Sequence, residues 1–220
     1  MILKALYDYY NRCGNLPAFG MEEKEIGFVI VISKEGKFVR FEDCRLDSKQ
    51  ARTYLVKKHV GRSSAIVANY LYDNSSYVLG YAENEKAKKD VEEQTKKRSD
   101  KENACLEAFK EKVDSIYKVY PENNDLAAIC KFYQQSKEDI LASISKDSLW
   151  EEIKKNLSKK YSTFSFRIDG DLKIIAEKKE ILQLEYSEDD NKGNGFCLIT
   201  GNKGITVDTT TATMIPGSQA

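Results

Sequence analysis

A mostly apolar run close to the amino terminus limits most strongly what this chain can fold into. This run covers residues 26–32, and a polar stretch that contains Gly36 separates it from a second apolar stretch at 38–41. Two short apolar runs joined by a glycine-bearing turn predict a β-hairpin. The chain therefore has to accommodate a sheet near its start.

The middle of the chain has a helical period instead. Apolar residues repeat there at steps of three and four, and Pro121 ends the pattern: Leu106, Phe109, Val113, Ile116 and Tyr120. This spacing places them on one face of a helix, which a proline stops. Ser136 and Ser148, each followed three residues later by an acidic residue, predict two further helix starts. A helical lobe from about 102 to 160 is therefore expected.

Strand patterns return toward the carboxyl end. Apolar and polar residues alternate over 164–168, and the pair at 169–170 predicts a turn into a second strand at 172–175. A further short strand is predicted at 196–199. Because strands, helices and strands follow one another in that order, we expect an α+β fold rather than a parallel βαβ array.

Three other segments complete the pattern. Residues 1–12 predict a short amphipathic helix, and residues 70–79 predict apolar packing whose class, helix or loop, the pattern leaves undecided. The segment 83–102 is nearly all charged, so we expect a solvated helix or a mobile segment that packs little.

Composition excludes several classes of protein. The five cysteines stand singly and the chain has one histidine, so we expect neither a zinc site nor a disulfide, and no cofactor. The sequence shows no apolar run long enough to cross a bilayer and no secretion signal, which predicts a soluble cytoplasmic protein. Since 35 basic residues balance 35 acidic ones, nucleic-acid binding has to come from a local patch.

The sequence shows no catalytic pattern. The single histidine, His59, lies beside two lysines, which disfavour its protonated form. The segment 200–204 lacks the glycine spacing of a phosphate loop, and the acidic cluster 188–190 is typical of an exposed loop rather than of a two-metal centre. We therefore expect no enzymatic activity, no catalytic residue and no metal site.

The clearest charge asymmetry lies between residues 48 and 72, where basic residues occur and acidic ones do not. Lysine and arginine neutralise phosphates, while asparagine, serine and arginine can reach base edges or sugars. The candidate nucleic-acid-binding residues are Lys57, Lys58, Arg62, Ser63, Ser64, Asn69 and Asn74. The alternative that these residues alone leave open is an ordinary polar corner around a buried core at 70–72.

Several separated stretches carry a resemblance to a known family. They read MILKALYDYY at 1–10, FVIVI at 28–32, RSSAI at 62–66, NYLYDN at 69–74, YVLG at 77–80, FRIDG at 166–170 and CLITG at 197–201. In order and rough spacing, the chain resembles the amino-terminal part of the large subunit of a type I-C (Dvulg subtype) CRISPR surveillance complex. By this resemblance, residues 1–204 form the DNA-recognition domain of a larger subunit. Residues 208–220 show no helix or strand terminator, so we expect 205–220 to be a truncated, poorly ordered tail.

The resemblance implies a non-catalytic subunit of a crRNA-guided complex. Such a subunit contacts the target double-stranded DNA at the short flanking motif (PAM) and steadies unwinding, while guide pairing reads the long sequence. The implied partners are the subunit that holds the crRNA handle, the backbone subunits, the crRNA, and a recruited helicase-nuclease that cuts. Two alternatives stay open: a protein-only adaptor that docks to the handle subunit, and a metal-dependent nuclease.

Overall fold

The computed structural model describes residues 2–13, 17–18, 20–62, 65–82, 92–159, 161–184, 195–196 and 203–204. The chain divides into two compact units. One unit is Ala18–Leu184, and the other comprises Met1–Pro17 together with Glu185–Ala220.

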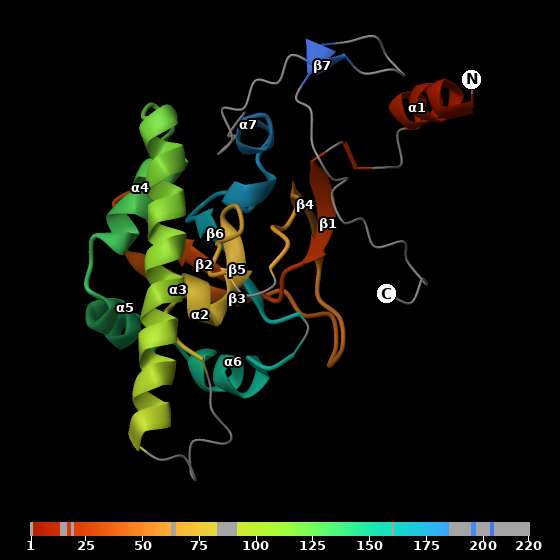
Figure 1. Ribbon diagram of the computed structural model, residues 1–220. Helices are drawn as coiled ribbons and strands as arrows, with labels where there is room; N and C mark the ends of the chain where they lie inside the picture. Colours follow the sequence, from red (N-terminus) through yellow and green to blue (C-terminus); the bar gives the residue numbers. More distant parts are fainter. Residues whose placement is uncertain are drawn as a thin grey trace. The chain divides into compact units, whose positions relative to one another are not determined.

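A four-stranded mixed sheet forms the centre of the unit Ala18–Leu184 (Figure 1). Its strand order is β3-β2-β6-β5, with β2 (Phe28–Ile32) and β6 (Thr163–Ile168) in the middle. β2 pairs in parallel with β6, while β3 (Phe38–Asp43) and β5 (Tyr72–Asn74) pair antiparallel at the two edges. Every residue of β2 is buried, as its apolar composition requires. The α+β class is confirmed.

The predicted hairpin is confirmed as β2 and β3, and its turn depends on a glycine. Gly36 has a φ of +76°, a conformation that costs other residues energy. A Cβ atom at this position would lie 2.5 Å from the backbone nitrogen of Phe132. Gly36 therefore allows both the turn and its close contact with a helix.

Helices cover one side of this sheet (Figure 1). They are α3 (Glu92–Val119), α4 (Asn124–Tyr133), α5 (Lys137–Ile144) and α6 (Trp150–Asn156), with the short α2 (Ser75–Val78) after β5. The alternating aromatic residues of β6 face them. The ring of Phe166 lies 6.4 Å from that of Phe109 in α3 and 5.7 Å from that of Phe132 in α4. The predicted helical period in the middle of the chain is confirmed.

A two-stranded ribbon lies on the other side of the sheet (Figure 1). It pairs β1 (Met21–Glu25) antiparallel with β4 (Thr53–Lys57). The 3₁₀ helix η2 (Ile175–Glu177) contacts both β4 and β6, and α7 (Lys179–Leu182) follows it. This ribbon and η2 bring residues from both ends of the unit together.

Two local predictions were wrong. The turn at Gly170 forms, with φ +89°, but no strand follows it: Leu172 is 95% exposed and the chain enters η2. β6 instead pairs with strands far away in the sequence. Ser148 does not cap α6, whose N-cap is Leu149, and the Asp147 side chain accepts the Leu149 backbone N–H. The predicted Ser136 cap of α5 is confirmed.

The second unit has few described residues. Its helix α1 (Ile2–Arg12) confirms the predicted amphipathic helix, and its apolar residues Ile2, Leu3, Leu6 and Tyr9 are exposed. β7 (Gly195–Phe196) pairs with β8 (Lys203–Gly204), whereas 197–199 and the predicted tail 205–220 lie outside the described residues. No helix in the described part of the chain is long and apolar enough to cross a membrane.

Candidate nucleic-acid interface

The predicted segment 57–74 begins at the last residue of β4 and ends with β5. Just before β5, Leu71 has a φ of +63°, an uncommon conformation for a residue with a branched side chain. Leu71 is buried, and its carbonyl accepts a hydrogen bond from the Ser165 hydroxyl at 3.0 Å. This bond to β6 fixes the direction in which the next residues enter the sheet.

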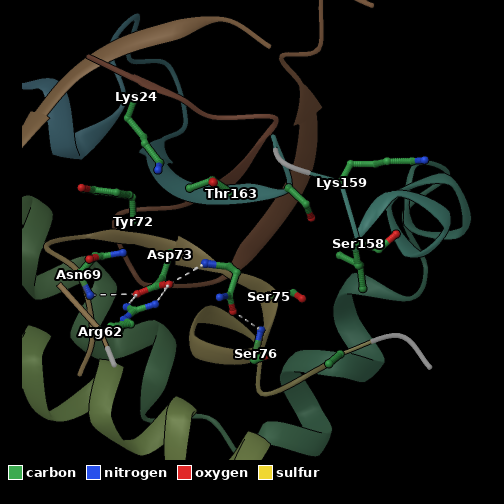
Figure 2. Close-up of a pocket in the computed structure, with 14 residues that line it drawn as sticks. Lys24, Arg62, Asn69, Tyr72, Asp73, Ser75, Ser76, Ser158, Lys159 and Thr163 are labelled. Carbon is green, nitrogen blue, oxygen red and sulfur yellow. Dashed lines mark hydrogen bonds and ion pairs between the residues drawn. The ribbon is translucent and has the colours of Figure 1, made fainter. Parts of the chain in front are cut away.

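Arg62 and Asp73 form a two-pronged ion pair at the centre of the segment (Figure 2). Arg62 Nη1 lies 3.0 Å from Asp73 Oδ1, and Nη2 contacts Oδ2. Arg62 Nε also donates to the carbonyl of Val67 at 2.6 Å, and the guanidinium lies 4.1 Å from the centre of the Tyr77 ring. Burial opposes the charge of Arg62, but Asp73 outweighs it and raises the pKa of the guanidinium.

Asn69 is hydrogen-bonded to its own chain. It is 8% exposed, and its side-chain oxygen accepts the backbone N–H of Val60 at 2.9 Å. Its backbone nitrogen donates to Asp73 Oδ2 at 2.9 Å. Asn74 is exposed and caps α2, since its side-chain oxygen accepts the N–H of Ser76 at 3.1 Å. Both asparagines therefore use their side-chain oxygens to hold the backbone.

The two predicted lysines differ in their surroundings. Lys57 is half-buried: its ammonium group donates to the carbonyl of Leu184 and lies 4.9 Å from the centre of the Tyr70 ring. Lys58 is exposed. The predicted residues Ser63 and Ser64 lie outside the described residues.

Glu22 links this segment to β1. Its carboxylate lies 2.7 Å from Nδ1 of His59, and the Tyr72 hydroxyl donates to it at 3.0 Å. Burial opposes ionisation of Glu22, but the hydrogen bonds from His59 and Tyr72 outweigh it and lower the pKa of the carboxyl. Burial, followed by the nearby Glu22 charge, raises the pKa of Tyr72. His59 thus has a structural contact with a carboxylate.

A polar pocket of about 460 Å³ opens beside the Arg62–Asp73 pair (Figure 2). Three predicted residues line it, namely Arg62, Asn69 and Asn74. The rest of its lining includes Lys24, Ser75, Ser158, Lys159, Ser162 and Thr163. The pocket brings together the strand β1, the segment after α6 and the start of β6.

Sequence reasoning missed Lys24 and Lys159. Lys24 lies in the acidic stretch of β1, so no local charge pattern singles it out. Lys159 lies about a hundred residues after the basic segment. In the described part of the chain, neither lysine has a carboxylate within ion-pair distance. Only the fold brings these two cations to the pocket.

No described residues form a group of three histidine, cysteine, aspartate or glutamate side chains that could hold a metal ion. The acidic cluster 188–190 lies outside the described residues. His59 faces Glu22 rather than a serine or cysteine nucleophile.

Comparison with known families gives a match over most of the chain. The model of a family described as CRISPR-associated protein (Cas_Csd1) matches residues 6–219. The match covers both compact units. None of the curated proteins searched matches the chain.

Proposed function

This chain belongs to the Cas_Csd1 family of CRISPR-associated proteins, and from that membership we propose that it is the non-catalytic large subunit of a crRNA-guided type I-C interference complex. In this proposal it contacts target duplex DNA at the PAM and stabilises unwinding. Base pairing with the guide reads the long sequence, and a recruited helicase-nuclease cuts the DNA. Its neighbours are the crRNA-handle subunit and the backbone subunits.

The observation that supports DNA contact is the polar pocket with its two lysines. The chain is neutral as a whole, so attraction to phosphates has to come from a local surface. Lys24 and Lys159 line one pocket together with three of the predicted binding residues, Arg62, Asn69 and Asn74. Exposed Lys58 adds a further cation to the same segment.

In this proposal the residues of the segment 57–74 have different parts. Lys58 is suited to a phosphate contact because it is exposed and flexible. Arg62 and Asn69 act as supports in the described conformation, since their polar groups bond to Asp73, Val67 and Val60. Asn74 lies where its amide nitrogen can approach a ligand while its oxygen caps α2.

The test is duplex binding by the assembled complex over a range of salt concentrations, with native chain and Lys58→Ala. Loss of one phosphate contact should weaken binding to all flanking sequences alike and reduce the slope of log K against log salt by roughly one unit. The matched control is Lys146→Ala, because Lys146 is also an exposed lysine but lies outside the segment 57–74. Equal slopes for all three proteins would remove Lys58 from the interface.

The use of Arg62 and Asn69 within the chain favours one competing function, a protein-only adaptor. In that case the segment supports docking to the handle subunit and DNA is read elsewhere. Asn69→Ala separates the two roles. Because Asn69 supports the segment in either case, lower stability is expected under both functions and only the other readouts decide. If complexes that carry the folded variant assemble normally but lose duplex binding or preference among flanking motifs, DNA contact is supported; if assembly falls while the complexes that do form keep their DNA preference, the adaptor role is favoured.

A further inference from the structure

Ser162 lines the pocket and has a buried hydroxyl group. The residue is 4% exposed, and among the described residues its Oγ has no hydrogen-bond partner. Buried polar groups are nearly always hydrogen-bonded, and an unpaired one is costly. A bound molecule that accepts a hydrogen bond here would remove that cost.

The charge around this hydroxyl is positive. Lys24 points into the pocket toward Thr163 (Figure 2), and no described carboxylate pairs with it. The one carboxylate in the lining, Asp73, is already paired twice with Arg62. Lys159 lies at the rim and extends away from the centre in Figure 2, so its long side chain can turn inward over a ligand.

These features select the ligand's chemistry. A metal cation would meet two ammonium groups, and an apolar molecule would leave the lining hydroxyls and amides unpaired. An oxyanion satisfies both requirements, because it accepts hydrogen bonds from hydroxyls and attracts ammonium groups. The volume of about 460 Å³ exceeds that of one oxyanion, so the oxyanion belongs to a larger molecule.

We propose that this pocket binds a phosphate group, held by the ammonium of Lys24 and the hydroxyls of Ser162 and Thr163, with Lys159 closing over it. The inference rests on the proposed function for the source of the phosphate, which is the backbone of a nucleic-acid strand. It places the anchoring contact on β1 and β6, outside the segment 57–74. The phosphate site itself does not depend on that source.

The first experiment measures binding of inorganic phosphate by the full chain, from the shift in Tm at matched ionic strength in chloride. Native protein and Lys146→Ala should be stabilised alike, since a ligand stabilises the state that binds it. Lys24→Ala should bind phosphate about tenfold more weakly, as expected for loss of a charge-assisted hydrogen bond. The same phosphate response in Lys24→Ala and native protein would overturn the site.

Ser162→Ala distinguishes ligand binding from a structural role. Because Ser162 Oγ has no protein partner, its removal should leave the Tm without phosphate unchanged or raised. Phosphate affinity should fall several-fold in the same variant. A lowered Tm together with unchanged phosphate affinity would mean that the hydroxyl serves the fold and would contradict the proposal.

The second experiment identifies the source, using a short DNA duplex and a nucleoside monophosphate. Weaker duplex binding by complexes that carry Lys24→Ala supports a strand phosphate. If Lys24→Ala abolishes the binding of phosphate and of the monophosphate but leaves duplex binding unchanged, a nucleic-acid strand is not the source of the bound phosphate. If native complexes bind no duplex while phosphate still binds at Lys24, the proposed function fails and the phosphate site stands.

Discussion

Asp73 holds the segment 57–74 together. It is 2% exposed, and the predicted binding residues nearest to it in sequence are Asn69 and Asn74. Its carboxylate accepts hydrogen bonds from Arg62, from the backbone of Asn69 and from its neighbour Asn74. Burying a carboxylate is tolerable only with such compensation. Asp73 therefore anchors the basic segment to the rest of the fold.

The contribution of the Arg62–Asp73 ion pair to stability can be measured with Arg62→Ala. The change leaves a buried carboxylate without its ion pair, so we expect a loss of about 2 to 4 kcal/mol in the free energy of unfolding. The double variant Arg62→Ala/Asp73→Asn should be less unstable than the sum of the single changes, because no charge is then left buried. Denaturant unfolding measures both, with Lys58→Ala as an exposed control; a loss no larger than the control's would contradict the role of the pair.

Glu22 predicts a dependence of stability on pH. Its pKa in the folded chain lies below the ordinary 4.5, so its stabilising contribution is present above that value and is lost as the pH falls through the folded pKa. Glu22→Gln should therefore be less stable than native protein at neutral pH, and this gap should shrink in acid. Unfolding followed at several pH values tests this, with the exposed Glu180→Gln as control. A gap that is independent of pH would rule out the carboxylate as its source.

At this scale the sequence singled out the basic segment 57–74 but could not assign the orientation of its side chains. The acid-free stretch that begins at 48 ends just before Asp73, and that first acid folds back onto Arg62. Charge patterning records which residues are basic, whereas it contains no information on which of them meet a buried acid. Lys24 was missed for the corresponding reason, because acidic neighbours in sequence hide a cation that the fold separates from them.

At the level of helices and strands, the elements that follow from short-range sequence patterns were predicted, whereas the pairing of distant strands was not. The hairpin of β2 and β3 and the helix α3 follow from spacing within one segment. The pairing of β2 with β6 is parallel and joins distant segments, so no local pattern announces it. The alternation over 164–168 and the turn at 169–170 predicted a second hairpin, but the mostly buried position of β6 between β2 and β5 decided its partners.

The contact between the β2–β3 turn and α4 gives a prediction with a built-in control. In Gly36→Ala the new Cβ would lie 2.5 Å from the backbone nitrogen of Phe132, and the residue would have a left-handed backbone conformation. We therefore expect a loss of about 3 kcal/mol or more in the free energy of unfolding. Gly170→Ala has a similar φ of +89° but no atom within 4 Å, so it should cost about 1 kcal/mol. Thermal unfolding compares the two. Equal losses would mean that the close contact with α4 is unimportant.

For the whole molecule, the division into two units predicts that one of them folds alone. The unit Ala18–Leu184 contains the central sheet and the helices that cover it. A fragment limited to these residues should unfold cooperatively, with a Tm within about 4 °C of the complete chain, which corresponds to about 1 kcal/mol at this size. Calorimetry of the two proteins measures this. Loss of the cooperative transition in the fragment would show that the other unit is required.

The central position of β6 also has a consequence for how the protein is made. β2 ends at Ile32 and its parallel neighbour begins only at Thr163. At translation rates of about 5–20 residues per second, roughly 6 to 30 s separate the synthesis of the two strands. During that interval the apolar edge of β2 has no native partner, and an unpaired strand edge is a template for association with other chains. Nascent chains of this protein therefore expose this strand edge until β6 has been synthesised.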